Sequence, residues 1–130
     1  MKQIENNQRL DLSDSFSQVT LLFADIVNFT KYSAQVVSPS EVVKLLKTLF
    51  EEFDQECRIH QVYKVYTIGD CYVVMGMLNA FNRNPRKEAR NVVEMAINML
   101  KIIREVRNKV NFLELDMRIG IHTVIFLIFC

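Results

Sequence analysis

The sequence predicts a ferredoxin-like α/β (α+β) domain, in which two long helices cover one face of a four-stranded antiparallel sheet. The first observation is the order of the periodic segments, which alternate as strand, helix, strand, strand, helix and strand. The second is size, because 130 residues, 50% of them hydrophobic, suffice for one domain with its own core. Right-handed crossovers between these elements give the strand order 4-1-3-2.

The first strand is predicted over Val19–Ala24, an apolar run typical of a strand that is buried on both faces. It ends at a single carboxylate, Asp25, and a short helix over Phe29–Val37 is expected to follow. A lone acid at the exit of a buried strand, beside the free N–H groups of a helix start, can hold a cation against a phosphate. The polar residues 1–17 are expected to form a linker.

The first long helix is predicted to begin at Ser38, with proline at the first helical position and glutamate at the third. It is expected to end near Cys57, and the second long helix is predicted from Lys87 to about Arg107. In both segments apolar residues recur at helical spacing and are assigned to the core. In the second helix these residues are Val92, Val93, Ala96, Ile97, Leu100 and Ile103.

Two segments rich in β-forming residues, 61–67 and 71–76, flank Ile68-Gly69-Asp70 and indicate a hairpin. Asparagine and proline residues then indicate a loop over 79–86. The last strand is predicted over 114–122, which completes the set of strands that the fold class requires.

The predicted topology brings two acidic residues together. The first and third strands are antiparallel neighbours, so Asp25 at the end of one lies beside Asp70 at the start of the other. Two carboxylates beside a helix N-terminus suit Mg²⁺, which takes oxygen ligands. The alternatives are that Asp25 caps the following helix and that Asp70 is an ordinary turn residue. We favour the metal site because the topology pairs the two acids.

Composition excludes several classes of function. A net charge of +1, from 16 basic and 15 acidic residues, does not indicate a surface for polyanions, so we expect no nucleic-acid partner. Three widely spaced cysteines suit a reducing compartment better than a disulfide framework or a zinc site. No signal-peptide core and no membrane-spanning segment is found in the sequence. We expect a cytoplasmic domain, or the cytosolic part of a membrane-bound parent protein.

Three motifs resemble the catalytic domain of the class III nucleotide cyclases, the adenylyl and guanylyl cyclases. They are FADIVNFT at 23–30, VYKVYTIGDCYVV at 62–74 and MRIGIHT at 117–123. They follow the family's order and spacing, and the resemblance covers about Gln18 to Thr123. Diguanylate cyclases have a related ferredoxin-like palm, but their GG-(D/E)-E-F hairpin is absent here.

The resemblance implies a reaction in which the 3′-hydroxyl of ATP or GTP attacks the nucleotide's own α-phosphate, which gives a 3′,5′-cyclic nucleotide and pyrophosphate. It implies that Asp25 and Asp70, with the carbonyl of Ile26, bind two Mg²⁺ (or Mn²⁺) ions. Arg118 would reach the triphosphate, although a surface strand arginine is the alternative. The implied phosphate-binding residues are Val27, Asn28, Phe29, Thr30 and Arg118.

The chain departs from the family pattern in three places. Asn28 stands where the family usually has glycine, and asparagine tolerates a positive φ better than most residues. Tyr66 replaces the Glu or Lys of base recognition, so we expect a strand aromatic and no usual base contact. After Thr123 the sequence VIFLIFC replaces the family's continuation. We favour a truncated or misread coding sequence, and the alternative is an over-long fourth strand buried in the sheet.

Class III cyclases act as dimers whose sites combine residues of both partners, so the resemblance implies a complementary cyclase domain in a homo- or heterodimer. We expect residues 18–123 to be the metal-bearing half, inactive alone, between the linker and an atypical tail at 124–130. One rival is a catalytically dead cyclase-like module for dimerisation or regulation, which the two retained aspartates disfavour. The other is a ferredoxin-like binding domain for RNA or metabolites, which the neutral charge disfavours.

Overall fold

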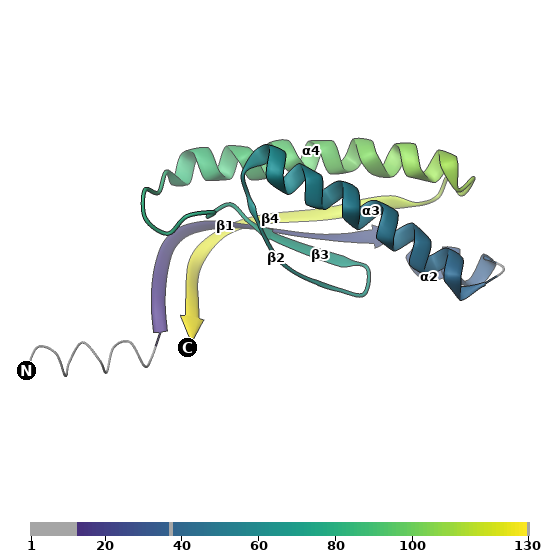
Figure 1. The fold of residues 1–130 in the computed structure, drawn as a ribbon, viewed down its shortest axis with the longest axis horizontal. Helices are drawn as coiled ribbons and strands as arrows, with labels where there is room; N and C mark the ends of the chain where they lie inside the picture. Colours follow the sequence, from purple (N-terminus) through teal and green to yellow (C-terminus); the bar gives the residue numbers. More distant parts are fainter. Residues whose placement is uncertain (1–12, 37, 130) are drawn as a thin grey trace, which may run out of the picture.

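The computed structural model describes residues 13–36 and 38–129 of the chain (Figure 1). Its elements in chain order are β1 (Ser13–Val27), α2 (Phe29–Gln35), α3 (Pro39–His60), β2 (Tyr63–Ile68), β3 (Cys71–Met75), α4 (Pro85–Lys109) and β4 (Asp116–Phe129). None of the described helices combines the length and apolarity needed to cross a membrane.

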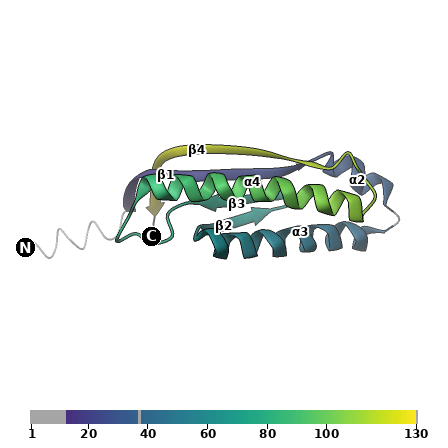
Figure 2. The ribbon, with the colours of Figure 1, turned by 90° about the horizontal axis from the view of Figure 1, so that it is seen from above.

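The sheet confirms the predicted topology. Its strands lie in the order β2-β3-β1-β4, and every neighbouring pair is antiparallel. Figure 2 shows α3 and α4 side by side on the same face of the sheet. The central strand β1 therefore has β3 on one side and β4 on the other, as the site prediction requires.

The first and last strands in the chain, β1 and β4, are longer than the sequence pattern predicts. β1 begins at Ser13, inside the segment expected to be a linker, and β4 continues to Phe129 through most of the apolar tail. Their register runs from Ser13 opposite Phe129 to Val27 opposite Asp116, with an irregularity between Phe16 and Val19. Figure 1 shows both strands bending away from the sheet side by side. Residues 124–129 are thus an extension of the last strand.

The second long helix begins earlier than predicted, at residues that the sequence analysis assigned to a loop. Asn84 is the N-cap of α4, its side chain accepts a hydrogen bond from the Lys87 N–H, and Pro85 is the first helical residue. Asparagine followed by proline is a favourable helix start for these reasons. The loop prediction over 79–86 is therefore wrong for Pro85 and Arg86, which belong to the helix.

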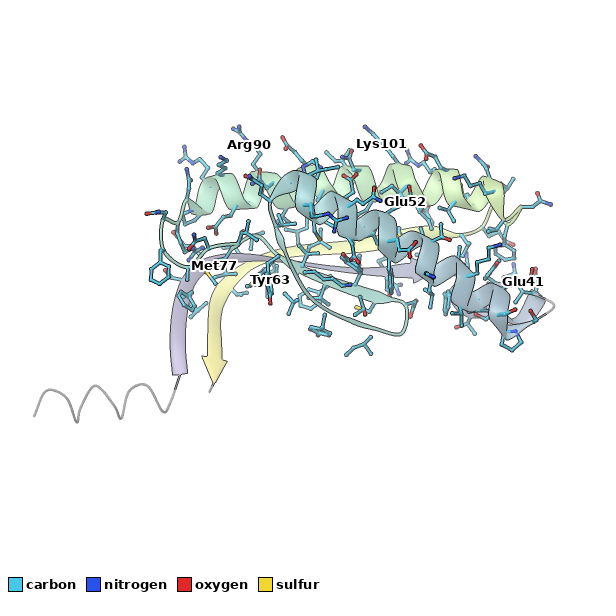
Figure 3. All side chains as sticks on the ribbon, viewed as in Figure 1. Glu41, Glu52, Tyr63, Met77, Arg90 and Lys101 are labelled. Carbon is cyan, nitrogen blue, oxygen red and sulfur yellow. The ribbon has the colours of Figure 1, made fainter. Side chains whose placement is uncertain are left out.

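The core lies between the two long helices and one face of the sheet. Its fully buried side chains include Leu22, Tyr72, Val74, Leu49, Phe53, Met95, Met99 and Ile103. Two predicted core residues of α4, Val93 and Ile97, are 45% and 49% exposed, so that prediction is wrong for them. The buried stripe is centred on Met95 and Met99 instead. In Figure 3, Arg90 and Lys101 of the same helix point away from the sheet.

The opposite face of the sheet carries the side chains that alternate with this core. Leu22 and Ala24 of β1 face the helices, so Phe23 and Asp25 face the other way. Phe23 remains 44% exposed. The end of β1 that carries Asp25 therefore opens on a sheet face that α3 and α4 leave uncovered.

Candidate active site

An open cavity of about 640 Å³ lies where β1 ends and α2 begins. It is lined by Asp25, Ile26, Val27, Asn28, Phe29, Thr30, Lys31, Asp70 and Arg118. All eight residues that the sequence analysis assigned to metal or phosphate binding are in this set. Lys31 is the one lining residue that it missed, although this residue directly follows the FADIVNFT motif.

The sheet register explains why Asp25 and Asp70 line one cavity. β1 and β3 pair antiparallel up to Ala24 opposite Tyr72, and both acids lie just beyond this pair at the same end. Asp70 follows Gly69, whose φ of 58° shapes the tight turn between β2 and β3. Asp70 is therefore a turn residue, as its alternative interpretation held, and it also faces the cavity.

Asn28, where the resemblance implies glycine, lies at the start of α2. Its φ is 64° and its ψ is 21°, in the left-handed region, and it is the N-cap of α2. Its side chain makes no capping bond, and its Nδ2 donates to the carbonyl of Glu114 at 2.9 Å. The turn therefore survives the substitution. Because Asn28 is the cap, the alternative that Asp25 caps this helix is wrong.

Arg118 is the direct partner of Asp25. The two residues lie opposite each other in the β1–β4 register, and the guanidinium donates from Nε to Oδ1 at 3.2 Å and from Nη2 to Oδ2 at 2.9 Å. The Arg118 side chain is 74% exposed and that of Asp25 is 34% exposed. The hydrogen bonds and charge of Asp25 raise the pKa of Arg118, and Asp70 adds to this shift.

The negative charges of Asp25 and Asp70 also act on Cys71. It follows Asp70 and lines a smaller hollow together with Asp25 and Arg118. Burial raises the pKa of the Cys71 thiol, and the charges of Asp25 and Asp70 raise it further. Both carboxylates thus act on the same two neighbours, Cys71 and Arg118. The sequence analysis did not single out Cys71, although it stands beside Asp70.

The second cation at the cavity has its own partner. Lys31 Nζ donates to both carboxylate oxygens of Glu114, at 2.7 and 2.8 Å, and both side chains are about half exposed. Lys31 is therefore paired with Glu114 and not with the two aspartates of the cavity. Of the two described cationic residues that line this cavity, Arg118 is the one whose charge interacts with Asp25 and Asp70.

The donor set fits Mg²⁺ that shares its coordination with a substrate. Within residues 13–36 and 38–129, no group of three or more His, Cys, Asp or Glu side chains is arranged to hold a metal alone. Mg²⁺ is commonly held by one or two carboxylates together with substrate phosphates and water. Asp25 and Asp70 provide such a pair at one open cavity, with room beside them for a phosphate group.

Tyr66 lies apart from this cavity. It is on β2 opposite Val73, and it is 44% exposed. Neither a carboxylate nor an ammonium group stands at this position, which agrees with the expectation of a strand aromatic.

Comparison with known proteins identifies a family. The sequence model of the family described as "Adenylate and Guanylate cyclase catalytic domain" matches residues 12–128. The guanylate cyclase soluble subunit alpha-1 of Mus musculus is 42% identical over 108 residues, which cover 83% of this chain and 15% of that protein. Guanylate cyclase alpha of Plasmodium falciparum is 40% identical over 117 residues, which cover 88% of this chain and 3% of that protein.

Solved structures give the same result. The guanylyl cyclase domain of the RhoGC fusion protein from Blastocladiella emersonii has a TM-score of 0.72 and 27% identity, over 90% of this chain and 62% of that one. The guanylate cyclase domain of RhGC from Catenaria anguillulae, in complex with GTP, has a TM-score of 0.69 and 26% identity, over 88% and 68% of the two chains. The chain therefore spans a small part of its curated relatives and about two thirds of these domains.

Proposed function

Because the chain belongs to the adenylate and guanylate cyclase catalytic domain family, we propose that it forms the metal-binding half of a nucleotide cyclase site. The substrate is a nucleoside triphosphate, ATP or GTP, and the products are a 3′,5′-cyclic nucleotide and pyrophosphate. Phosphoryl transfer of this kind depends on positioning and on charge stabilisation more than on a protein nucleophile. The named relatives are guanylate cyclases, which supports GTP as the substrate.

One observation carries the proposal. Residues from three separate segments, 25–30, 70 and 118, line one open cavity although up to 93 positions separate them in the sequence. In the proposed site, Asp25 and Asp70 bind two Mg²⁺ (or Mn²⁺) ions, and the Ile26 carbonyl adds a ligand. Bound metal supplies Lewis-acid chemistry, which favours ionisation of the 3′-hydroxyl and offsets the charge of the triphosphate.

Residues 27–30 and Arg118, which line the same cavity, bind and orient the triphosphate. The backbone from Val27 to Thr30 passes through the left-handed turn at Asn28 into α2, where the first N–H groups have no intrahelical acceptor. These donors suit phosphate oxygens. Arg118 adds a planar set of donors, which matches the geometry of a phosphate group better than a lysine does.

The proposal assigns the rest of the catalytic machinery to a second domain. Tyr66 provides no charged group for base recognition, and residues 124–129 continue β4. We therefore expect a homo- or heterodimer in which a complementary cyclase domain contributes the missing groups, and little activity from this chain alone. Tyr66 also favours a second candidate, a catalytically dead module that serves dimerisation or regulation.

A metal titration distinguishes the two candidates. We expect Mn²⁺ with a non-cyclisable triphosphate analogue to stabilise the chain. At ten times its dissociation constant, a ligand adds about 1.4 kcal/mol, which raises the melting temperature by roughly 4–6 °C. Asp25→Asn and Asp70→Asn should each abolish the shift. Glu105→Ala, which removes an exposed acid from α4, is the matched control and should keep it.

The outcome that contradicts the metal site is equally clear. If millimolar Mn²⁺ or Mg²⁺ with the analogue produces no thermal shift in the unsubstituted chain, the metal-binding half is not functional and the dead module is favoured. If the shift occurs, assays of cyclic GMP and cyclic AMP with an added complementary cyclase domain identify the substrate.

A further inference from the structure

The Arg118–Asp25 pair has a feature that the proposed function does not use. Two strands present the pair to each other directly across the register, so their separation depends on the sheet and not on a loop. Both carboxylate oxygens accept a bond from the guanidinium, at 3.2 and 2.9 Å. In this state the proposed metal ligand already carries a positive partner.

We propose that Arg118 is an exchangeable counter-ion, which neutralises Asp25 in the metal-free site and moves to the triphosphate when metal binds. This inference rests on the proposed function and adds a coupling to it. The same guanidinium serves two anions in turn, so that metal binding and triphosphate binding favour each other.

Charge and geometry explain why metal and guanidinium compete for Asp25. A carboxylate has further lone-pair positions, so the paired arginine does not block it sterically. However, Mg²⁺ approaches its oxygen ligands to about 2.1 Å, which brings two cations together on one side chain. Coulomb repulsion at such separations is large even in a partly hydrated site. Asp25 therefore accepts the metal most readily after Arg118 has left.

Because the ion pair is exposed to solvent, breaking it costs little free energy. Arg118 is 74% exposed and its guanidinium can return to water, whereas a buried cation would have no such route. Exposed ion pairs contribute little free energy. We therefore expect the competition to weaken metal binding by only about three- to fivefold.

The cavity also determines where Arg118 goes. It shares the lining with Asn28 and Thr30, on the phosphate side of the proposed site, and it experiences the charge of Asp70 as well. Once metal neutralises both acids, a bound triphosphate is the remaining concentration of negative charge at the cavity. Lys31 is not the counter-ion of Asp25, because the two hydrogen bonds of its ammonium group go to Glu114.

The test compares two variants that remove one positive charge each from the same cavity. Arg118→Gln removes the partner of Asp25, whereas Lys31→Gln removes a cation whose hydrogen bonds go to Glu114. The affinity for Mn²⁺ is measured on the whole chain by electron paramagnetic resonance of free Mn²⁺, with and without a non-cyclisable triphosphate analogue. A third variant, Arg118→Lys, keeps the positive charge but cannot donate two parallel hydrogen bonds from a planar guanidinium.

Without nucleotide, we expect Arg118→Gln to bind Mn²⁺ about three- to fivefold more tightly, and Lys31→Gln to change it by less than about twofold. With the analogue present, the gain in Mn²⁺ affinity that it causes should be smaller in Arg118→Gln than in the unsubstituted chain, because binding coupling is reciprocal. Arg118→Lys should give intermediate values for both quantities.

Equal Mn²⁺ affinities of Arg118→Gln and Lys31→Gln would overturn the counter-ion role, and weaker binding by Arg118→Gln would also do so. In either case the proposed function stands, provided that the unsubstituted chain binds Mn²⁺ and Asp25→Asn does not. If the unsubstituted chain binds no Mn²⁺, the proposed function fails and the inference fails with it.

Discussion

Asp25 and Asp54 are equally accessible carboxylates with very different surroundings. The side chain of Asp25 is 34% exposed and that of Asp54 is 36% exposed. Asp25 is held by an exposed arginine, whereas Asp54 Oδ1 accepts from the Tyr72 hydroxyl at 2.6 Å and lies 3.0 Å from Lys64 Nζ. The exposure of an acid therefore does not show whether its partner can be exchanged. What distinguishes the two acids is whether that partner is exposed, as Arg118 is, or buried, as Tyr72 is.

Tyr72 is the enclosed partner. Its side chain is fully buried, its ring centroid lies 5.3 Å from those of Phe50 and Phe53, and its hydroxyl lies 3.4 Å from Cys57 Sγ. Burial, followed by the hydrogen bond to Asp54, raises the pKa of Tyr72 far above its ordinary value. Such a group keeps its proton and its position.

The two regions are linked through β3. Tyr72 stands two residues after Asp70, so the network that fixes Tyr72 also fixes the strand that begins beside the proposed metal ligand. The site thus combines a rigid support on one face of the sheet with an exposed, exchangeable ion pair on the other. The following variants test that division, from the largest expected effect to the smallest.

Tyr72→Ala should destabilise the fold most. Removing a fully buried aromatic ring leaves a cavity among Phe50 and Phe53 and takes away the hydroxyl partner of Asp54. We expect a loss of about 3–5 kcal/mol in the free energy of unfolding, measured with urea. Tyr66→Ala, a half-exposed position on β2, is the control and should lose far less. Comparable losses in Tyr72→Ala and Tyr66→Ala would show that the buried Tyr72 network is not the rigid support of the site.

Tyr72→Phe removes only the hydroxyl and should cost about 1 kcal/mol at neutral pH. It should also change the alkaline behaviour. Above about pH 10 an unfolded tyrosine loses its proton while native Tyr72 keeps it, so unfolding becomes easier as pH rises, by up to about 1.4 kcal/mol per pH unit.

This pH-dependent loss should diminish in Tyr72→Phe and persist in Tyr63→Phe, which alters a half-exposed tyrosine. The Cys57 thiol, whose pKa burial also raises, contributes a loss of the same sign that begins at lower pH. Urea titrations at several pH values between 7 and about 11 measure both. A slope that Tyr72→Phe leaves unchanged would show that Tyr72 is not the titrating group.

Asn28→Ala tests the turn at the exposed site. Alanine must adopt the positive φ of 64° and loses the bond to the Glu114 carbonyl, so we expect a loss of about 1 kcal/mol. Asn28→Gly loses the same bond but relieves the backbone, and should lie within about 0.5 kcal/mol of the unsubstituted chain. Urea unfolding of both variants measures the difference, and equal losses would argue against the conformational explanation.

Asp25→Asn should have the smallest effect on stability. It removes one charge from an exposed pair, so the shift in the urea midpoint should be less than roughly a tenth of that caused by Tyr72→Ala. The same substitution should nevertheless abolish Mn²⁺ binding. A stability loss as large as that of Tyr72→Phe would mean that the Arg118–Asp25 pair is structural.

The sequence pattern was sufficient for the centre of the molecule. The hydrophobic strand before Asp25 and the hairpin at Gly69 determine which strands neighbour each other, and this topology is enough to bring Asp25 and Asp70 to one cavity. The positive φ of Asn28 follows from the motif in which it stands. These predictions depend on strand order, which periodicity reveals.

The features that were missed depend on register and on partners distant in sequence. Ser13 begins a strand because β4 pairs with it, and its polar neighbours give no strand pattern of their own. Likewise, the bond between Asp25 and Arg118 requires knowing which residue of β4 lies opposite. Val93 and Ile97 were misassigned because adjacent apolar residues on a helix share the helical spacing, and packing decides between them.

The register between β1 and β4 also has a consequence for the order of events in folding. It joins the first and last described strands, from Ser13 to Phe129, and it carries the Asp25–Arg118 contact. Contacts that close loops of such length slow folding, because their entropy cost precedes their benefit. During synthesis, Asp25 can therefore meet its arginine only after the chain up to Arg118, 93 positions further on, has been made.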